Sequence, residues 1–461
     1  MNTPNPNIAK LDLKNKKLLI MGAGKSGQAA ASLALQAGGS VLLSDDKELK
    51  DIQNIDWLLN NSHVQFCQSS KLSTQLNGVD FAVISPGIPS NATSVLNVQS
   101  KNIPIVSELA FGASFMPCPY AAVTGTNGKT TTTMLLGLMF SKGGFVSHVC
   151  GNIGFPISTA ALSANPADRA VVEVSSFQLE FPDGLHPKAA AILNISADHL
   201  DRHGSMEEYI SLKKRIYTNM NGDDFLVLNS NDKSLKDAAL DAKANVFWFS
   251  SEGEVPMGAF LKDSNLYMRD GNTEKLLCHI EDIQMPGLHN LENVLAASSL
   301  AYLMGIPVPV IRHSIKTFNG AEHRIEFVKE INGTVYYNDS KATNPDSTIK
   351  AIKAMQSPVI LIAGGFNKDT PFDALAECIV NSNVKAVVLT GDTANQIAKA
   401  LKEYNYTNIF TTDSLNAAVL QANKLSKPSD VVLFSPACSS FDHFKSYEER
   451  GNHFKDIVNN L

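Results

Sequence analysis

The residues best suited to chemistry lie in one segment, Thr-Gly-Thr-Asn-Gly-Lys-Thr-Thr-Thr-Thr at 124–133. Apolar runs precede and follow it, so the sequence predicts a strand, a glycine-punctuated turn and a buried helix. These are the parts of a phosphate-binding loop, in which backbone N–H groups and a helix N-terminus approach an anion. Lys129 is predicted to neutralise phosphate oxygens, and Thr130 to offer a hydroxyl ligand to Mg²⁺. The full pattern would need glycine at 123, where Val123 stands, so the loop is a shortened relative; a threonine-rich turn is the minor alternative.

Two later positions are candidate metal ligands. Glu173 interrupts an apolar strand, where a buried carboxylate is costly without a partner, and Mg²⁺ beside the loop would supply that partner. The alternative is a glutamate at a strand end that faces solvent. His199 follows the strand predicted at 189–195, at the sheet edge where ligands gather. It is predicted to bind a second Mg²⁺ or to contact substrate, although a lone histidine is more often a polar loop residue.

A helix predicted from Met206 to about Asn219 carries the basic run Lys213-Lys214-Arg215. From the sequence alone, a solvated basic face is the favoured interpretation. A buried lysine near metals can instead lose its proton and react. Further on, a helix predicted over 287–304 carries Asn290 and Asn293 on one face, where they could read a base edge or cap the helix.

Near the N-terminus, the segment Gly22-Ala23-Gly24-Lys25-Ser26-Gly27 follows a predicted strand at 17–21 and opens a helix predicted over 28–37. This glycine pattern in a parallel βα unit is typical of dinucleotide binding. The next strand, at 41–44, ends at Asp45-Asp46, near the place of a ribose-binding acid. The pattern serves any diphosphate, including a UDP-sugar, and a tight turn that binds nothing remains the alternative.

The last third alternates predicted strands with helical stretches, after a hairpin signal at 331–334. Strands are predicted at 359–363, 386–389, 408–410 and 431–434, which indicates a second open α/β sheet. Polar turns follow two of them, at 364–368 and 435–440, where a crevice at the carboxyl ends of the strands would form.

Length and composition narrow the class of protein. A chain of 461 residues predicts about three domains, and 44% hydrophobic with 18% charged residues is ordinary for a globular protein. The net charge of −6 gives no basic patch for nucleic acid. Six scattered cysteines without a C-x-x-C pair suit reduced thiols in a cytoplasm, and the sequence shows neither a signal peptide nor a membrane-spanning stretch.

Taken together, the motifs resemble the ATP-dependent Mur ligases of peptidoglycan synthesis, over essentially the whole chain. The short Thr-Gly-Thr-Asn-Gly-Lys-Thr loop is the family's own form. The D-glutamate-adding branch is the most similar, and the meso-diaminopimelate branch's Asp-Asn-Pro-Arg segment is not found. The other matching segments are Glu-x-Ser-Ser-Phe-Gln-Leu at 173–179, Asp-His-Leu-Asp-Arg at 198–202, His289-Asn290, His323-Arg324, Asp-Ser-Lys-Ala-Thr-Asn at 339–344, Ser-Pro-Gly-Ile at 85–88, and Ser-Pro-Ala-Cys at 435–438 through Phe444-Lys445.

The resemblance implies an α/β protein of three domains. These are a Rossmann-like UDP-substrate domain at 1–106, a central P-loop ATPase-type domain at 107–320, and a Rossmann-like amino-acid-binding domain at 321–461. It implies a ligase that uses ATP and two Mg²⁺ ions to join D-glutamate to UDP-N-acetylmuramoyl-L-alanine through an acyl phosphate and a tetrahedral intermediate. The expected partners are these small molecules, with no nucleic acid and no membrane, and the expected state is a cytoplasmic monomer.

The resemblance also implies roles for individual residues. Lys129, Lys213 and His199 are expected to be catalytic, with Lys213 carbamylated so that it becomes an anionic oxygen ligand. The expected metal ligands are Thr130, Glu173, His199 and Lys213. ATP is expected to contact Gly125, Thr126, Asn127, Gly128, Lys129, Thr130, Thr131, Asn290, Asn293, Arg324 and Asp339. The UDP-substrate is expected to contact Gly22, Gly24, Lys25, Ser26, Gly27, Asp45, Asp46, Gly87, Asn152 and Gln178. D-glutamate is expected to contact Lys341, Thr343, Lys368, Ser440 and Tyr447.

Three other classes of protein would explain part of this sequence. Folylpolyglutamate synthetase also adds glutamate but lacks a UDP-binding first domain, whereas residues 1–106 form a complete βα unit here. An NAD-dependent dehydrogenase would explain Gly22–Gly27 but leaves the 124–133 loop and Glu173 unexplained. A catalytically dead binding protein would have lost ligand residues, yet Lys129, Glu173 and His199 are all present.

Overall fold

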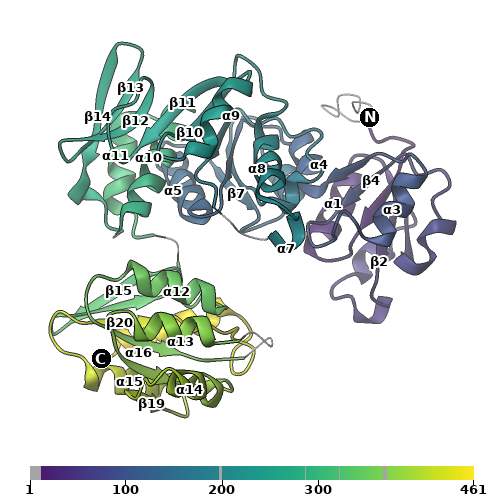
Figure 1. Cartoon of the computed structure of the whole chain (residues 1–461). Helices are drawn as coiled ribbons and strands as arrows, with labels where there is room; N and C mark the ends of the chain where they lie inside the picture. Colours follow the sequence, from purple (N-terminus) through teal and green to yellow (C-terminus); the bar gives the residue numbers. More distant parts are fainter. Residues whose placement is uncertain (1–11, 197–199, 286, 321, 367–370) are drawn as a thin grey trace. The chain divides into compact units, whose positions relative to one another are not determined.

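The computed structural model describes residues 12–196, 200–285, 287–320, 322–366 and 371–461. Three α/β sheets follow one another along the chain (Figure 1), which confirms the predicted fold class. Contacts divide the chain into two compact units, one up to Ile283 with Leu288–Phe318, and one of Gln284–Gly287 with Asn319–Leu461. The first unit contains two sheets and the second contains one. The domain boundaries predicted at 106/107 and 320/321 stay predictions.

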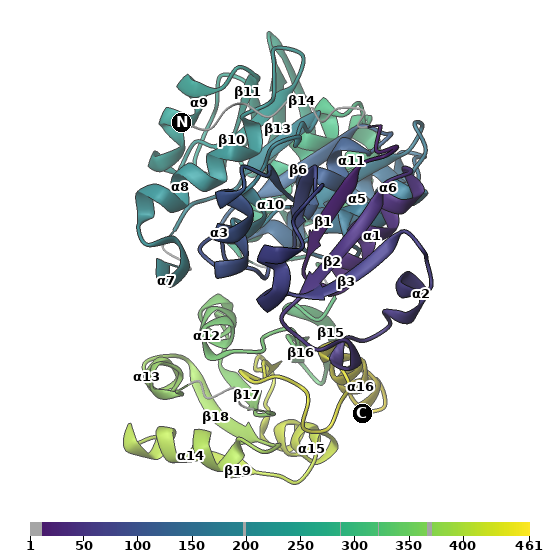
Figure 2. The same ribbon diagram turned by 90° about the vertical axis from the view of Figure 1, so that its right-hand side faces the viewer.

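The first sheet has the strand order β3-β2-β1-β4-β5, with every pair parallel. Alternate residues of β1 serve opposite faces, because side chains alternate along a strand. Leu18 and Ile20 pack in the cluster that includes α1, whereas Leu19 and Met21 pack with α3. Figure 2 shows α1 and α3 on opposite sides of these strands. The elements are β1 (Lys17–Met21), α1 (Lys25–Gln36), β2 (Ser40–Asp45), α2 (Asp56–Leu59), β3 (Val64–Gln68), β4 (Phe81–Ile84), α3 (Thr93–Ser100) and β5 (Ile105–Ser107), with 3₁₀ turns at Leu49–Asp51 and Ser69–Thr74.

The second sheet has nine strands in the order β14-β13-β12-β11-β10-β9-β6-β8-β7. Its strands β6 to β12 pair in parallel, and β12, β13 and β14 form an antiparallel extension. Parallel strands covered on both faces read as continuous apolar runs, as β6 does. The strands are β6 (Tyr120–Thr124), β7 (Ser147–Gly151), β8 (Arg169–Glu173), β9 (Ala189–Ile192), β10 (Phe225–Asn229), β11 (Asn245–Ser250), β12 (Gly258–Lys262), β13 (Asn265–Asp270) and β14 (Thr273–His279).

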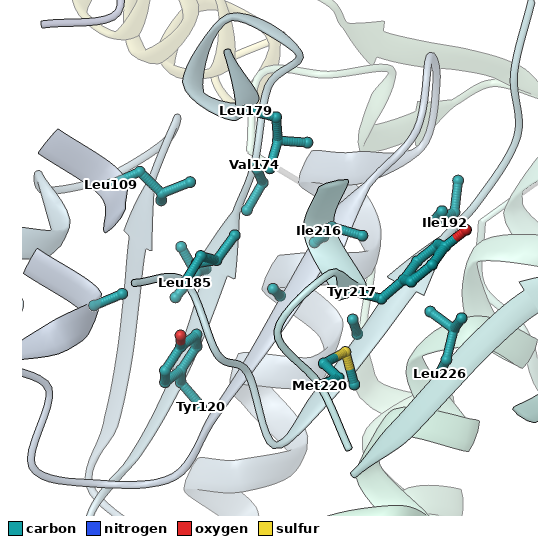
Figure 3. Close-up of a cluster of buried hydrophobic side chains, with 14 of the residues drawn as sticks. Leu109, Tyr120, Val174, Leu179, Leu185, Ile192, Ile216, Tyr217, Met220 and Leu226 are labelled. Atoms are coloured by element: carbon teal, nitrogen blue, oxygen red, sulfur yellow. The ribbon is translucent and has the colours of Figure 1, made fainter. Parts of the chain in front are cut away.

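Helices cover both faces of this sheet. On one face, Leu109 of α4 joins Tyr120, Ile192 and Leu226 in a buried cluster, shown in Figure 3. Helices α5 and α10 pack against each other and against β8 and β10. The helices are α4 (Glu108–Ser114), α5 (Lys129–Lys142), α6 (Ile157–Ser163), α7 (Leu200–His203), α8 (Met206–Lys214), α9 (Lys236–Asp241), α10 (Leu288–Leu303) and α11 (Val308–Thr317), with 3₁₀ turns at Phe177–Leu179, Arg215–Tyr217, Lys233–Leu235 and Ile280–Asp282.

The third sheet has the order β15-β16-β20-β17-β18-β19, parallel except for the hairpin β15/β16. The predicted turn joins that hairpin, and Asn332 and Gly333 both have positive φ. Helices α12, α13 and α14 share one apolar cluster, and α15 and α16 share the other. The elements are β15 (Glu326–Ile331), β16 (Thr334–Asn338), α12 (Pro345–Ala354), β17 (Val359–Ala363), α13 (Asp373–Val380), β18 (Val384–Leu389), α14 (Ala394–Glu403), β19 (Ile409–Thr411), α15 (Leu415–Leu425), β20 (Val431–Phe434) and α16 (Tyr447–Asn459).

Some predicted boundaries are wrong. The strand predicted at 189–195 is β9, which ends at Ile192. The helix predicted to reach Asn219 ends at Lys214, and a 3₁₀ turn follows. Among the described residues, no helix is both long and apolar enough to span a membrane.

Candidate active site

The phosphate-binding loop connects β6 to α5, and two of its glycines have conformations that side chains disfavour. Gly125 has φ +150° and Gly128 has φ +84°. A Cβ on Gly125 would lie 3.0 Å from Leu193 Cβ, and one on Gly128 would lie 2.1 Å from Asn293 Oδ1. Conformation and space therefore both require glycine. The first-turn N–H groups of α5 have no partner within the helix, so they can bind phosphate.

The outer side of the loop is held by the segment that follows β9. Thr126 N donates to Asn194 O at 2.9 Å, and Asn127 N donates to Asn194 Oδ1 at 2.8 Å. Thr126 Oγ1 accepts from Ser196 N at 3.0 Å. The hydrogen bonds of Thr126 and Asn127 therefore fix the shape of the loop, and sequence reasoning missed Asn194 as the residue that does it.

Two lysine side chains meet at one carbonyl oxygen of this loop. Lys129 Nζ and Lys213 Nζ each donate to Gly125 O at 2.9 Å. Lys213 is only 1% exposed, so the solvated-face interpretation is wrong for it. Lys214 instead lies 3.4 Å from the carboxylate of Asp241. Of Lys213 and Lys214, the buried Lys213 is the one to which the resemblance assigns a catalytic role.

A cavity of about 130 Å³ adjoins the two lysines. It brings together residues from three predicted groups: the ATP loop, the UDP-substrate contacts and the metal ligands. None of the remaining lining residues had been singled out from the sequence, although three of them lie in the matching segment at 173–179. The lining residues are Lys129, Asn152, Ser175, Ser176, Phe177, Tyr209 and Lys213.

Glu173, at the end of β8, is 1% exposed, so the solvent-facing alternative is wrong. Its Oε1 accepts from Asn152 Nδ2 at 2.8 Å, and its backbone carbonyl accepts from Asn152 N at 2.9 Å. Its Oε2 is buried and has no hydrogen-bond partner in the described structure. An orphaned carboxylate oxygen is costly, and a divalent cation would satisfy it.

The donor set fits Mg²⁺ better than a metal that needs a full protein cage. Across the described ranges, no group of three or more His, Cys, Asp or Glu could hold a metal ion. Mg²⁺ usually keeps several waters and takes one or two carboxylates together with substrate phosphates. Glu173 and the buried Thr130 at the start of α5 suit that role. His199, the ligand predicted for a second ion, lies outside the described residues.

In the first sheet, the glycine loop after β1 is tightly built. Gly22 has φ +93°, and a Cβ on Gly27 would lie 1.7 Å from Gly22 O. Asp45 Oδ2 accepts from Ala23 N at 2.7 Å, and its Oδ1 accepts from Lys47 N at 2.9 Å. Asp45, which is predicted to contact the UDP-substrate, therefore also fixes the loop that would bind the diphosphate of that substrate.

The other predicted contacts around this loop are open to solvent to different degrees. Gly24 is the N-cap residue of α1, and Ser26 is half-buried. Lys25, Asp46 and Gly87 are exposed. Their side chains or backbone are therefore accessible to a ligand, and their roles as UDP-substrate contacts stay predictions.

Arg202 connects the two sheets of the first unit, and sequence reasoning gave it no separate role. Its Nη1 donates to Pro86 O at 3.4 Å, its Nη2 donates to Ile88 O at 3.3 Å, and its Nε donates to Glu180 Oε1 at 3.0 Å. The guanidinium thus positions the backbone on both sides of Gly87. Its place in the Asp-His-Leu-Asp-Arg segment was the only available signal.

Three predicted amides are held by the protein itself. Gln178 Oε1 accepts from Ser175 N and from Ser175 Oγ, both at 3.0 Å. Asn293 is buried behind Gly128, and its Nδ2 donates to Asn290 Oδ1 at 3.2 Å. The Asn pair therefore lies on one helix face as predicted, and Asn293 supports the phosphate loop rather than capping the helix. Contacts of these amides with ligands stay predictions.

In the second unit, the predicted nucleotide residues differ in exposure. Arg324 is exposed, and Asp339 is 4% exposed. Asp339 Oδ2 accepts from Ser435 Oγ at 2.6 Å, and burial raises the pKa of this carboxyl to about 7. Asp339 therefore joins the end of β16 to the end of β20, where the polar turn predicted at 435–440 begins.

Of the residues predicted for D-glutamate, Lys341 and Thr343 follow β16, Ser440 follows β20 and Tyr447 begins α16. Lys341 Nζ lies 5.5 Å from the ring centroid of Tyr447, and Thr343 N donates to Lys341 O at 2.9 Å. Ser440 is buried. Lys368 lies outside the described residues.

Arg450 joins the turn after β16 to the turn after β20, and it was not among the residues predicted from the sequence. Its Nη2 donates to Ser340 O at 2.8 Å and to Cys438 O at 3.0 Å, and its Nη1 donates to Ser439 O at 3.1 Å. Arg450 is 3% exposed, and burial lowers its pKa to about 10. Nothing in the sequence around Arg450 indicated that it lies on the buried face of α16 or that it bonds these carbonyls.

The fold and the site define a nucleotide-dependent α/β protein with a phosphate-binding loop, a buried lysine and an orphaned carboxylate in one place. Residues 123–301 match the Mur ligase middle domain, and residues 323–438 match the glutamate ligase domain of Mur ligases. The chain belongs to the Mur ligase family, which confirms the resemblance drawn from the motifs.

Full-length relatives support this membership. The chain is 43% identical to the UDP-N-acetylmuramoylalanine--D-glutamate ligase of Thermoanaerobacter pseudethanolicus, over 98% of this chain and 100% of that protein. It is 40% identical to the protein of the same name from Clostridioides difficile, with the same coverage. Among solved structures, MurF from Acinetobacter baumannii has a TM-score of 0.59 at 16% identity, covering 95% of this chain and 93% of that one. MurF of Thermotoga maritima in complex with ADP has a TM-score of 0.56 at 15% identity, covering 97% and 96%, and both show the shared fold.

Proposed function

We propose that this chain is an ATP-dependent ligase that joins D-glutamate to UDP-N-acetylmuramoyl-L-alanine, as the names of its full-length relatives indicate for them. The observation that carries the proposal is the cavity in which Lys129, Asn152 and Lys213 meet, beside the orphaned oxygen of Glu173. A dehydrogenase with a glycine-rich first domain would have no need of this second, phosphate-binding centre.

The chemistry follows from the weakness of a carboxylate as an electrophile. In the proposed reaction, the muramoyl-alanine carboxylate attacks the γ-phosphate of ATP, which gives an acyl phosphate and ADP. The amine of D-glutamate then attacks the acyl carbon, and the tetrahedral intermediate expels phosphate. The chain contributes charge and position, which are the main means of catalysis in phosphoryl transfer.

Lys129 would bind the phosphates of ATP. Its ammonium donates to the carbonyl oxygens of Gly125 and Thr126, at 2.9 Å in each case. In the presence of ATP it would donate to charged phosphate oxygens, which form stronger hydrogen bonds than these neutral acceptors. The first-turn N–H groups of α5 hold the same phosphates from the other side. Asn152 reaches the same cavity, where it would contact the sugar-alanine substrate.

Thr130 and Glu173 are the described residues that would hold Mg²⁺, and a second ion is proposed at His199 with a carbamylated Lys213. When bound, the cation screens negative charge between the anionic reactants. Lys213 is already buried at the loop, 4.4 Å from the ring centroid of Tyr209. For D-glutamate, Lys341, Thr343, Lys368, Ser440 and Tyr447 are the proposed contacts.

Phosphate release from ATP tests the proposal, measured with UDP-N-acetylmuramoyl-L-alanine and each of D-glutamate, L-glutamate, L-lysine and meso-diaminopimelate. We expect release that depends on both the UDP-sugar and D-glutamate. Release with another amino acid would keep the ligase and change the assignment of residues 339–447. No release with any amino acid, from folded protein that binds ATP, would refute the function.

We further propose that the protein is a cytoplasmic monomer with domains at 1–106, 107–320 and 321–461. Cell fractionation tests the location, light scattering tests the oligomeric state, and limited proteolysis tests the domain boundaries.

A further inference from the structure

Glu108 is a buried acid outside the catalytic cavity, and no step of the proposed reaction uses it. It is the first residue of α4, it is 2% exposed, and its Oε1 accepts from Ser158 N at 3.0 Å. Ser158 is the second residue of α6. Keeping a carboxylate buried is costly, so a site that retains one requires an explanation beyond packing.

The contact between α4 and α6 leaves no room for adjustment. A Cβ on Gly112 would lie 2.6 Å from Ser158 N and 2.7 Å from a side-chain carbon of Ile157. The start of α6 is therefore pressed against the backbone of α4. Glu108 supplies a directional bond between α4 and α6, whereas Leu109 and Ile157 of the same helices share an apolar cluster.

The segment that ends at Ser158 begins at the catalytic cavity. At its first end, Gly151 has φ +99° and a Cβ there would lie 2.3 Å from Glu173 O. The next residue, Asn152, bonds Glu173 through both its backbone N–H and its side chain. Gly151 N also donates to Phe155 O at 2.9 Å, which closes the segment into a compact turn. Residues 151–158 thus form a short strap with one end at Glu173 and the other at Glu108.

We propose that Glu108 is a positioning residue, which holds the 151–158 strap so that the Asn152 amide faces the catalytic cavity and fixes the carboxylate of Glu173. This inference rests on the proposed function, because that function assigns Asn152 to substrate and Glu173 to Mg²⁺. Glu108 acts through Ser158 and touches neither group. The bond needs an acceptor oxygen at this reach, so an amide can replace the acid, whereas alanine cannot.

Steady-state kinetics of Glu108→Ala, Glu108→Gln and the matched control Asp224→Ala test the proposal. Asp224 is also a buried acid, 4% exposed; it accepts from Asn221 N at 3.0 Å and also lies 2.7 Å from His186 Nε2 and 3.5 Å from Lys188 Nζ. It lies outside the strap and the cavity. We expect Glu108→Ala to raise the KM for the UDP-sugar substrate and the half-saturating Mg²⁺ concentration about tenfold, while the KM for D-glutamate changes less than about twofold. Glu108→Gln is expected to stay within about twofold of wild type, because its amide oxygen still accepts from Ser158.

Asp224→Ala separates positioning from stability. We expect it to lower the melting temperature at least as much as Glu108→Ala, because it also removes the contacts with His186 and Lys188, without changing either constant. An equal rise in KM in Asp224→Ala, or unchanged constants in folded Glu108→Ala, would overturn the proposal. Hydrogen exchange at the Asn152 amide gives a readout that needs no turnover: we expect faster exchange in Glu108→Ala only. Wild-type protein without D-glutamate-dependent phosphate release would refute the proposed function, and the exchange result would still decide the role of Glu108.

Discussion

Glu173→Gln should separate catalysis from stability at the orphaned carboxylate. The replacement keeps an oxygen to accept from Asn152 Nδ2, a bond of 2.8 Å, and it changes only Oε2, which has no partner to lose. No described hydrogen bond is broken, so the free energy of unfolding should change by less than about 1 kcal/mol. For a domain of about 150–250 residues, a change of 1 kcal/mol corresponds to a shift of about 2–4 °C in melting temperature.

Activity should respond far more strongly. A metal ion contributes several kcal/mol of charge stabilisation, and each ~1.4 kcal/mol is a factor of ten in rate, so we expect a loss of at least about a hundredfold in kcat/KM. The assay is phosphate release across a Mg²⁺ titration, with melting temperature measured on the same preparations. Glu173→Ala is the control, because it also removes the bond from the exposed Asn152 amide, a net loss of about 0.5–1.5 kcal/mol. A Gln variant with activity within about tenfold of wild type and an unchanged Mg²⁺ requirement would refute the assignment of Glu173 to the metal.

Three further predictions concern buried charges. Lys213→Ala should lose most activity and recover part of it with added short carboxylates, whereas Lys214→Ala should stay active; rescue by none of several carboxylates, or full activity without rescue, would count against a carbamylated Lys213. Burial raises the pKa of Glu108 from 4.5 to about 7, so the folded state keeps a proton that the unfolded chain has lost, and stability should fall as pH rises from about 4.5 to 7. Glu108→Gln should flatten that fall in melting temperature, and an unchanged slope would contradict the assignment. Arg450→Met removes the donors of three turn carbonyls at about 1–3 kcal/mol each, so it should lower the melting temperature and raise the KM for D-glutamate; unaltered values of both would contradict its role.

The sequence predicted the parts of the fold that depend on neighbouring residues. Gly125 and Gly128 marked the phosphate loop because their conformations are nearly closed to other residues. The turn at Asn332-Gly333 marked the hairpin for the same reason. The strand predicted at 189–195 was too long, because the N–H of Ile195 bonds the carboxylate of Asp232, 37 residues away, and not a neighbouring strand.

The site was predicted less completely, because burial and long-range bonds leave little trace in a local pattern. Lys213 stands in a basic run that reads as a solvated face, yet the fold turns it inward to Gly125. Arg202 bonds Pro86 across 116 residues of sequence, and Arg450 bonds Ser340 across 110. Spacing alone could not pair these groups.

The bonds of Arg450 also have a consequence for the order in which the chain acquires its function during synthesis. The turns that contain Ser340 and Ser439 leave the ribosome before α16 does, and until α16 docks, their carbonyls lack the guanidinium that joins them. Helices form quickly, but docking must wait for the polypeptide to emerge. The proposed amino-acid pocket should therefore be the last part of the molecule to take shape, so a nascent chain would fold its phosphate-binding loop well before these turns are joined.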